Sequence, residues 1–364
     1  MSIASVAIIG AGTMGGGIAI GCIAAGFRTC VIDLDAGRLE AIEQRARRFL
    51  DRAVQKERMS RAQADAAIAC LRNGRDLKDV AGADLVIEAV FEDLAVKRDL
   101  LAGIANHLAP EAIVATNTSA LRVAALADAL PGPERFLGLH YFSPAEVNPL
   151  VEVVSGPKTS LATLDKALAF VAATEKTPLP CRDASGFAVN RFFCPYTNEA
   201  ARLLGEGVAS TAQIDEVACA AFDLPLGPFA VMNIIKPRIA LNAVQNLAGL
   251  GAFYHPASAL IHAGTERDAW EISATPAPLD DETAQLIAER LRAALFLPVL
   301  EAVGEKVAAP DDFDLGARVA LRFGMPPVAA MRALGRDRTV ALITPVAAQY
   351  GAGLPVAGLD TVFG

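Results

Sequence analysis

A glycine cluster directly after the first apolar run constrains the fold of this chain more than any other feature. Val6–Ile9 is followed by Gly10-Ala11-Gly12-Thr13-Met14-Gly15. Gly10 and Gly12 suit a backbone that turns tightly and approaches a pyrophosphate, because a Cβ atom there would collide with the turn or with the phosphate. Gly15 lets the following helix lie close to the strand, and the N–H groups at the start of that helix can bind the diphosphate.

An acid closes the second apolar run, where Thr29–Ile32 leads into Asp33. A carboxylate at this point accepts hydrogen bonds from a ribose diol, and its charge repels a 2′-phosphate. The order of strand, glycine triplet, helix, strand and acid is much more specific than the triplet alone. The sequence therefore predicts a nicotinamide dinucleotide site that prefers NAD to NADP.

The length, composition and charge of the chain limit its class. Its 364 residues suggest two or three domains, and a hydrophobic content of 53% supplies a large core. The net charge of −8 argues against a nucleic-acid partner. Six scattered cysteines without a CxxC pair indicate reduced thiols, so we expect a cytoplasmic protein.

The uncharged stretch Ile3–Phe27 has the look of a signal peptide or a membrane span. No basic residue precedes it, however, and its seven glycines lie where a nucleotide loop and close helix packing require them. We therefore expect no contact with a membrane.

Short apolar runs alternate with helical stretches over the first half of the chain. This alternation predicts a Rossmann-like, doubly wound α/β sheet that forms an NAD-binding domain over residues 1–183. The expected strands are Val6–Ile9, Thr29–Ile32, Asp84–Val90, Ala112–Ala115, Phe136–Phe142, Leu150–Val154 and Pro178–Cys181.

Residues 37–72 are predicted to form two helices that project from the sheet. Ser60-Arg61-Ala62-Gln63 has the form of a capping box and would begin the second helix. Two interpretations of this pair remain open: a solvated face with Glu–Arg pairs, or a lip that holds an anionic substrate tail. Its basic residues include Arg45, Arg47, Arg48, Arg52, Lys56, Arg58 and Arg61.

From residue 184 onward the sequence is helical in character and contains two similar stretches. Asn198–Met232 can be aligned with Leu300–Met331, with one short gap. Past that gap the offset stays at 99 residues, so that Ile214-Asp215 falls on Phe313-Asp314. A constant register of this kind indicates a duplicated helical unit.

The predicted all-α part therefore has two sections. Residues 184–282 form the first helical domain, which includes a connecting arm rich in Gly, Pro and Ala over 249–281. Residues 283–364 form a second, shorter helical repeat. The two sections could pack on each other as the two copies in a homodimer would.

His140 is the one histidine with a chemical context. His107 lies near a helix end, while His255 and His262 lie in the connecting arm, and none has ligand-type neighbours at metal spacing, so we predict no metal site. His140 belongs to Leu137–Pro144, a strand that runs into a loop at the carboxyl end of the sheet. Ligands bind at that edge in open α/β folds.

Glu152 gives this histidine a partner. It lies in the middle of the apolar strand Leu150–Val154, where an unpaired carboxylate is costly. A nearby imidazole would satisfy it. A carboxylate on one ring nitrogen fixes the tautomer and leaves the other nitrogen as a proton acceptor near neutral pH.

Two further polar residues follow element ends. Ser119, in Thr116–Leu121, comes after another strand, and Asn190, in Ser185–Arg191, would begin the first helix of the second domain. We therefore expect a site built from two domains that meet at a cleft.

These motifs together resemble the L-3-hydroxyacyl-CoA dehydrogenase family. The resemblance is strong over residues 5–232 and weak beyond them. It implies a Rossmann-like domain with a helical second domain, NAD as the cofactor, and oxidation of a 3-hydroxyacyl thioester in fatty acid β-oxidation. The matching motifs, in order, are Gly10-Gly12-Gly15, Asp33, Glu88–Glu92, Asn117–Ser119, Gly138–Pro144, Leu150–Val153 and Gly186–Arg191.

The resemblance also implies residue roles. His140 would be the catalytic acid/base and Glu152 its orienting carboxylate. Ser119 and Asn190 would contact the substrate oxygen and the region around the nicotinamide, and Lys56 would contact CoA. The residues implied for the cofactor are Gly10, Gly12, Thr13, Met14, Gly15, Asp33, Glu92, Lys97 and Asn117.

The chain departs from the family pattern in the helical part and near the catalytic strand. Met232–Arg238 stands where the family usually has an Asp and a Gly-Leu-Asp turn, and Gly264–Trp270 stands roughly where a glycine- and aromatic-rich segment is usual. Asn148 occupies a position where the family often has Met. It would either change acyl specificity or be a neutral substitution.

The second helical copy resembles the arrangement in large multifunctional β-oxidation enzymes, although the chain has no hydratase-like segment. A homodimer and a monomer with an internal pseudo-dimer both remain open. Two alternatives to the main function also remain open. One is a related dehydrogenase of a non-CoA hydroxy acid such as carnitine or gulonate. The other is a non-catalytic nucleotide-binding or structural protein, which would not require Ser119, His140, Glu152 and Asn190 together.

Overall fold

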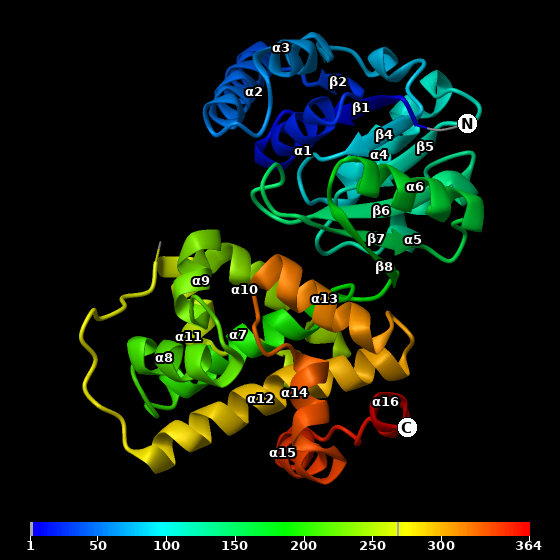
Figure 1. The fold of residues 1–364 in the computed structure, drawn as a ribbon. Coiled ribbons are helices and arrows are strands. Elements are labelled where there is room, and N and C mark those ends of the chain that lie inside the picture. The colour runs from blue at the N-terminus through cyan, green and yellow to red at the C-terminus, as the bar shows by residue number, and fades with distance from the viewer. Residues whose placement is uncertain (1–2, 268) are drawn as a thin grey trace. The chain divides into compact units, whose positions relative to one another are not determined.

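The computed structural model describes residues 3–267 and 269–364. The chain divides into two compact units, Met1–Asp183 and Ala184–Gly364 (Figure 1). The first holds the sheet and the second is helical, so the expected α/β class with an all-α part is confirmed.

The first unit is built on one eight-stranded sheet with the order β3-β2-β1-β4-β5-β6-β7-β8. Strands β1 to β6 are parallel to their neighbours, whereas β7 is antiparallel to β6 and parallel to β8. The strands are β1 (Ser5–Ile9), β2 (Arg28–Ile32), β3 (Leu71–Gly74), β4 (Leu85–Glu88), β5 (Ile113–Thr116), β6 (Phe136–Tyr141), β7 (Leu150–Ser155) and β8 (Thr177–Arg182).

Seven of these strands coincide with predicted ones, and β3 was not predicted. Its sequence, Leu-Arg-Asn-Gly, has two exposed polar residues in the middle and lies at the edge of the sheet. An edge strand of four residues buries too little apolar surface to leave a period-2 pattern, and here the pairing with β2 determines the structure.

Helices cover the sheet and complete the core of the first unit. Val6, Ile8, Val31, Ile87 and Leu137 belong to one buried cluster that also takes in Ile18 of α1 and Phe170 of α6. The helices are α1 (Thr13–Ala24), α2 (Ala36–Gln55), α3 (Arg61–Ala69), α4 (Leu94–Ile104), α5 (Val123–Ala127) and α6 (Leu161–Ala173).

The helical pair α2–α3 packs against α1 through one apolar face. Ala46 and Leu50 of α2 form a small buried cluster with Ala64 and Ala67 of α3 and with residues of α1. The predicted capping box is present, since the Ser60 N–H donates to Gln63 Oε1 at 2.8 Å and the Gln63 N–H donates to Ser60 Oγ at 3.2 Å. The pair is therefore anchored along its length rather than only projecting from the sheet.

The second unit is entirely helical among the described residues. Its helices are α7 (Val189–Gly205), α8 (Thr211–Phe222), α9 (Pro228–Ile235), α10 (Pro237–Gln245), α11 (Ser258–Glu266), α12 (Asp281–Gly304), α13 (Pro310–Leu321), α14 (Pro327–Leu334), α15 (Arg336–Gln349) and α16 (Val356–Phe363). Helices α8 and α13, and likewise α9 and α14, have the same lengths and start 99 residues apart.

The offset of 99 residues also relates the hydrogen bonds that cap α9 and α14. Asp215 accepts hydrogen bonds from the N–H groups of Phe229 and Ala230, at 2.8 and 3.0 Å, and so caps α9. Asp314 caps α14 in the same way, through the N–H groups of residues 328 and 329 at 2.7 and 2.9 Å. Helices α8 and α13 both end in left-handed residues, Asp223 and Arg322, which are also 99 apart.

The predicted connecting arm contains more structure than its composition indicates. Helix α11 lies within 249–281 and buries Leu260 and Ala263, so the irregular part starts only after Glu266. Beyond it, the Asn233 side chain donates to the Trp270 carbonyl at 2.9 Å and accepts from its N–H at 2.6 Å. The two segments that depart from the family pattern thus contact each other. Residue 268, in the predicted arm, lies outside the described residues.

Within the described part of the chain, no helix has the length and apolar character needed to cross a membrane. Helix α1, which lies within the uncharged stretch Ile3–Phe27, is only 12 residues long.

Candidate active site

The glycine loop between β1 and α1 leaves open space where a nucleotide would lie. A Cβ atom on Gly12 would meet no protein atom within 4 Å, whereas one on Gly15 would lie 1.9 Å from the carbonyl oxygen of Gly10. Gly15 therefore serves the packing of the loop itself. No side chain caps the start of α1. An open glycine at an uncapped helix start fits a dinucleotide diphosphate.

Asp33 is held in place beside this loop by backbone groups. Its Oδ2 accepts the N–H of Ala11 at 2.7 Å, and its Oδ1 accepts the N–H of Asp35 at 2.9 Å. Its side chain is only 13% exposed, and Arg38 lies 4.0 Å away. The carboxylate therefore ties the end of β2 to the glycine loop and keeps a fixed orientation.

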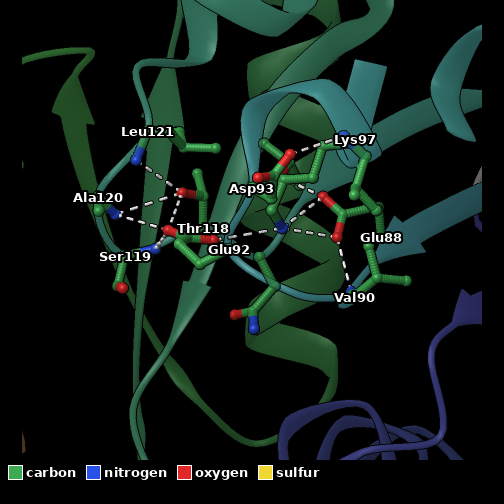
Figure 2. Close-up of polar contacts among 12 residues, drawn as sticks. Glu88, Val90, Glu92, Asp93, Lys97, Thr118, Ser119, Ala120 and Leu121 are labelled. Atoms are coloured by element: carbon green, nitrogen blue, oxygen red, sulfur yellow. Dashed lines mark hydrogen bonds and ion pairs between the residues drawn. The ribbon is translucent and has the colours of Figure 1, made fainter. Parts of the chain in front are cut away.

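A buried ion pair lies at the end of β4, next to the glycine loop between β1 and α1. Lys97 of α4 donates to both carboxylate oxygens of Glu88, at 2.6 and 2.8 Å, and neither side chain has any exposed surface (Figure 2). Glu88 also accepts from Val90 N–H at 2.7 Å and from Thr116 Oγ1 at 2.7 Å. These contacts satisfy both charges and lock β4, β5 and α4 together at the sheet edge.

Glu92 connects this ion pair to the loop that carries Ser119. Its Oε2 lies 3.4 Å from Lys97 Nζ, and its Oε1 accepts from Thr118 Oγ1 at 2.5 Å. The same oxygen accepts the N–H groups of Ser119 and Ala120, at 2.9 and 3.0 Å (Figure 2). Lys97 thus fixes Glu92, and Glu92 fixes the backbone of the Ser119 loop. The Ser119 side chain itself is exposed.

Asn117 connects the same loop to β6, the strand that carries His140. Its Oδ1 accepts the N–H of Tyr141, at the end of β6, at 3.0 Å. The side chain therefore sets the spacing between the ends of β5 and β6, where Ser119 and His140 lie.

His140 and Glu152 face each other across the antiparallel pair β6–β7. The two residues are direct register partners, and His140 Nδ1 lies 2.6 Å from Glu152 Oε2. The Glu152 side chain is fully buried and the imidazole is 8% exposed. The expected pairing is therefore present, and its cause is the strand register.

This pairing decides which ring nitrogen can act as a base. A carboxylate at Nδ1 favours the neutral tautomer with its proton on Nδ1, so the lone pair is on Nε2. When the ring takes a second proton, the carboxylate stabilises the imidazolium. The pair can therefore accept a proton from, or return one to, a hydroxyl group within reach of Nε2.

The basic residues of the α2–α3 pair divide into two groups. Arg45 binds Glu146 and Arg47 binds Glu43, at shortest distances of 2.6 and 2.8 Å, and Arg61 binds Asp51 at 2.7 Å. A second group is exposed and makes no ion pair within the described residues: Arg48, Arg52, Lys56 and Arg58. Paired and unpaired cations thus occur on the same helix pair, with Lys56 among the unpaired ones.

Asn190 and Asn148 lie outside β6 and β7, the strands that carry His140 and Glu152. Asn190 is the second residue of α7 and belongs to the second unit. The Asn148 side chain accepts the N–H of Leu150 at 3.1 Å and so shapes the start of β7. This contact gives Asn148 a structural role in the strand that carries Glu152.

Sequence reasoning missed the parts of the site that hold the Ser119 loop. Glu88 was noted only as part of a motif, and Thr116 and Thr118 were given no role. One signal was available: an acid that ends an apolar strand, followed nine residues later by a lysine on a helix with the apolar neighbours Leu100 and Leu101. Such an acid needs a buried cationic partner.

Comparisons with known proteins agree with this geometry. Residues 5–184 match the model of the 3-hydroxyacyl-CoA dehydrogenase NAD binding domain, and residues 186–265 match the model of the C-terminal domain of the same family. The chain belongs to the 3-hydroxyacyl-CoA dehydrogenase family. It is thus a member of a family of oxidoreductases, and its first unit is the NAD-binding domain.

The most similar curated relatives include the fatty acid oxidation complex subunit alpha of Shewanella sp. (strain ANA-3). It is 32% identical over 379 residues, an alignment that covers 94% of this chain and 53% of the relative. This chain therefore spans about half the length of that relative.

Two solved structures are also similar. (S)-3-hydroxybutyryl-CoA dehydrogenase from Ralstonia eutropha is 33% identical with a TM-score of 0.71, over 75% of this chain and all of the other. 3-Hydroxybutyryl-CoA dehydrogenase from Escherichia coli K12 has a TM-score of 0.86 over 98% of this chain and 96% of the other. At 23% identity it shows the shared fold.

Proposed function

We propose that this chain catalyses the NAD-dependent oxidation of an L-3-hydroxyacyl-CoA to the 3-ketoacyl-CoA, in the degradation of fatty acids or related acyl-CoA compounds. The observation that carries the proposal is the 2.6 Å contact between His140 Nδ1 and Glu152 Oε2. Family membership supports the reaction class, and the glycine loop with Asp33 supports the cofactor.

His140 is the acid/base in this proposal. NAD, when bound, supplies a hydride acceptor for the C3 carbon of the substrate. His140 Nε2 takes the proton of the C3 hydroxyl, and Glu152 holds the resulting imidazolium in place. In the reverse direction the imidazolium returns that proton to the forming alkoxide.

The cofactor contacts follow from the loops at the sheet edge. The loop from Gly10 to Gly15, with Thr13 and Met14, would hold the diphosphate, and Asp33 the adenosine ribose. Glu92 and Asn117 would lie near the cofactor. Because Lys97 is fully enclosed and bonded to Glu88, we assign it an indirect role, through Glu92.

The substrate contacts involve both units. Ser119 and Asn190 would contact the substrate oxygen and the region around the nicotinamide, and Lys56 would attract a CoA phosphate. Exposed arginines near Lys56 on α2–α3 support this last assignment, because unpaired cations favour an anionic tail.

The helical part has a proposed organisation of its own. We infer that residues 184–282 and 283–364 are copies of one unit that pack as an internal pseudo-dimer, and the offset of 99 residues supports this view. An assembly into a homodimer is the alternative. We also propose a cytoplasmic location and no nucleic-acid partner.

The first experiment is NADH oxidation with acetoacetyl-CoA, compared with NADPH and with the variant H140A. We expect turnover with NADH, little with NADPH, and a collapse in the variant. Tight NADH binding without turnover would contradict the CoA substrate and direct the search to carnitine and gulonate. Failure to bind either nucleotide would contradict the whole proposal.

A further inference from the structure

Arg191 follows Asn190 in the first turn of α7, and its guanidinium is enclosed by the protein. Its side chain is 2% exposed, and Nη2 lies 2.6 Å from Glu305 Oε1 and 3.7 Å from Glu301 Oε2. The Tyr254 ring lies 5.5 Å from the guanidinium carbon. Among the described residues, Nε and Nη1 of Arg191 have no hydrogen-bond partner. Glu305 is therefore the main anchor of this buried cation.

The start of α7 is buried, since Phe187 and Val189 are 2% and 0% exposed, and the ion pair adds a charged contact to this apolar packing. The turn before the helix places Gly186 and Phe187 at φ values of +77° and +48°. The N–H of Arg191 donates to the Gly186 carbonyl at 3.0 Å. A non-glycine residue in the left-handed region, such as Phe187, is strained and persists only where tertiary contacts hold it. The ion pair with Glu305 supplies such a contact.

Glu305 comes from the second helical section, directly after α12. It is the C-cap residue of that helix, and α12 packs along α7. Tyr254 donates to Glu301, one turn earlier on α12. Residues 283–364 thus reach the start of α7 through Glu305.

A second Arg–Glu pair lies at the other end of the contact between α7 and α12. Arg290 lies 99 residues after Arg191, and Glu206 lies 99 residues before Glu305. Arg290 Nη2 binds Glu206 Oε1 at 3.0 Å, and Arg290 Nε also binds Glu199 at 2.7 Å. Two equivalent pairs with exchanged partners are what a two-fold relation produces. The Arg290 pair is more fully hydrogen-bonded and does not adjoin Asn190.

We propose that Glu305 is a positioning residue for Asn190: by binding Arg191, it fixes the first turn of α7 and with it the Asn190 side chain. The second helical section thereby serves the reaction, although none of its residues is assigned a substrate contact under the proposed function. This inference rests on the role assigned to Asn190 under the proposed function.

The test compares E305Q with E206Q, which remove the same charge from the two equivalent pairs. Because a small displacement of a positioning group costs up to about 100-fold in rate, we expect E305Q to lower kcat/KM for acetoacetyl-CoA by about 10- to 100-fold. E206Q should stay within about twofold, because its partner Arg290 keeps Glu199. E305D, which retains the charge, should recover part of the loss.

A double-variant cycle distinguishes positioning from general destabilisation. If Glu305 acts through Asn190, E305Q should cost little in the N190A background. Hydrogen exchange gives a readout independent of turnover, and we expect faster exchange over 189–193 in E305Q alone.

Equal kinetic effects of E305Q and E206Q, or a full effect of E305Q in the N190A background, would overturn the inference. An inactive wild-type protein that still binds NADH would instead contradict the proposed function. The comparison of hydrogen exchange over 189–193 between E305Q and E206Q would then still decide whether Glu305 fixes the start of α7.

Discussion

Two fully buried glutamates in the same sheet differ in the partner that each one binds. Glu88, at the end of β4, is bonded to Lys97, whose side chain has no exposed surface. Glu152, in β7, is bonded to His140, whose side chain is 8% exposed. Both pairs have a shortest distance of 2.6 Å.

The partner of each glutamate separates a structural ion pair from the pair that we propose for catalysis. Lys97 and Glu88 are both fully enclosed, so their ion pair joins three elements of the fold and has no exposed atom that could contact a substrate. An imidazole has two ring nitrogens, so it can bind a carboxylate through one of them and exchange a proton through the other. A buried carboxylate therefore does not by itself indicate a catalytic site. The side chain that it binds decides its role.

The largest effect on turnover is expected for His140. Replacement by Ala removes the proton acceptor, so we expect kcat to fall by about 10²- to 10⁴-fold or more. NADH binding, measured by fluorescence titration, should stay near the wild-type value because the glycine loop and Asp33 are untouched. Turnover within tenfold of the wild type would place the acid/base elsewhere.

We expect E152Q to have the second largest effect on turnover. The amide can still accept from Nδ1–H, but it carries no charge to stabilise the imidazolium, so we expect a loss of roughly 10²- to 10³-fold in kcat. NADH affinity again serves as the control. An unchanged kcat would mean that Glu152 is structural, as Glu88 is, and would remove the contrast between the two pairs.

The variant K97M tests the structural pair. It leaves Glu88 buried without a cation, so we expect the free energy of unfolding in urea to fall by about 3–5 kcal/mol. Because Lys97 also contacts Glu92, which fixes the Ser119 loop, we expect the turnover of the folded fraction to fall as well, but by less than in H140A. The double variant E88Q/K97M should recover much of the stability, because no lone charge then remains. A change below about 1 kcal/mol in K97M would contradict the assignment.

Asp215 supplies a third kind of buried acid, whose partners among the described residues are backbone N–H groups. Burial raises its pKa to about 6, although the N–H groups of Phe229 and Ala230 act to lower it. The folded protein therefore binds more protons than the unfolded chain between pH 4 and 6, and stability falls as the pH rises through that window.

This pH dependence gives the smallest expected effect. Between pH 4 and pH 7 the wild type should lose about 1–3 kcal/mol more than D215N, as measured by urea unfolding at each pH. D314N, at the equivalent capping position, should act in the same direction, because burial raises that pKa also. Equal slopes for wild type and D215N would contradict the shift. Turnover at neutral pH should be unchanged.

Much of this architecture follows from local sequence. Seven of the eight strands, the capping box at Ser60 and the pairing of Glu152 with an imidazole were predictable. The strands depend on apolar periodicity, the capping box on the Ser-x-x-Gln spacing, and the pairing on the cost of an unpaired buried acid. The offset of 99 residues was visible as well, because the two stretches keep one register.

What could not be predicted depends on tertiary contacts. Strand β3 exists because β2 offers it an edge, and its own polar residues give no strand pattern. The link from Lys97 through Glu92 to the Ser119 loop joins three segments whose spacing in sequence carries no signal. In the same way, the helix within the predicted arm is stabilised by burial of Leu260 rather than by its composition.

Arg191 pairs with Glu305, and Arg290 pairs with Glu206, within one chain. The formation of these contacts therefore does not depend on the protein concentration. Partners joined by a linker meet at an effective concentration of order millimolar, set by the chain and not by the amount of protein in solution. The contact between α7 and α12 therefore forms in a unimolecular step. It persists at nanomolar protein, where two separate chains held by the same contacts would come apart.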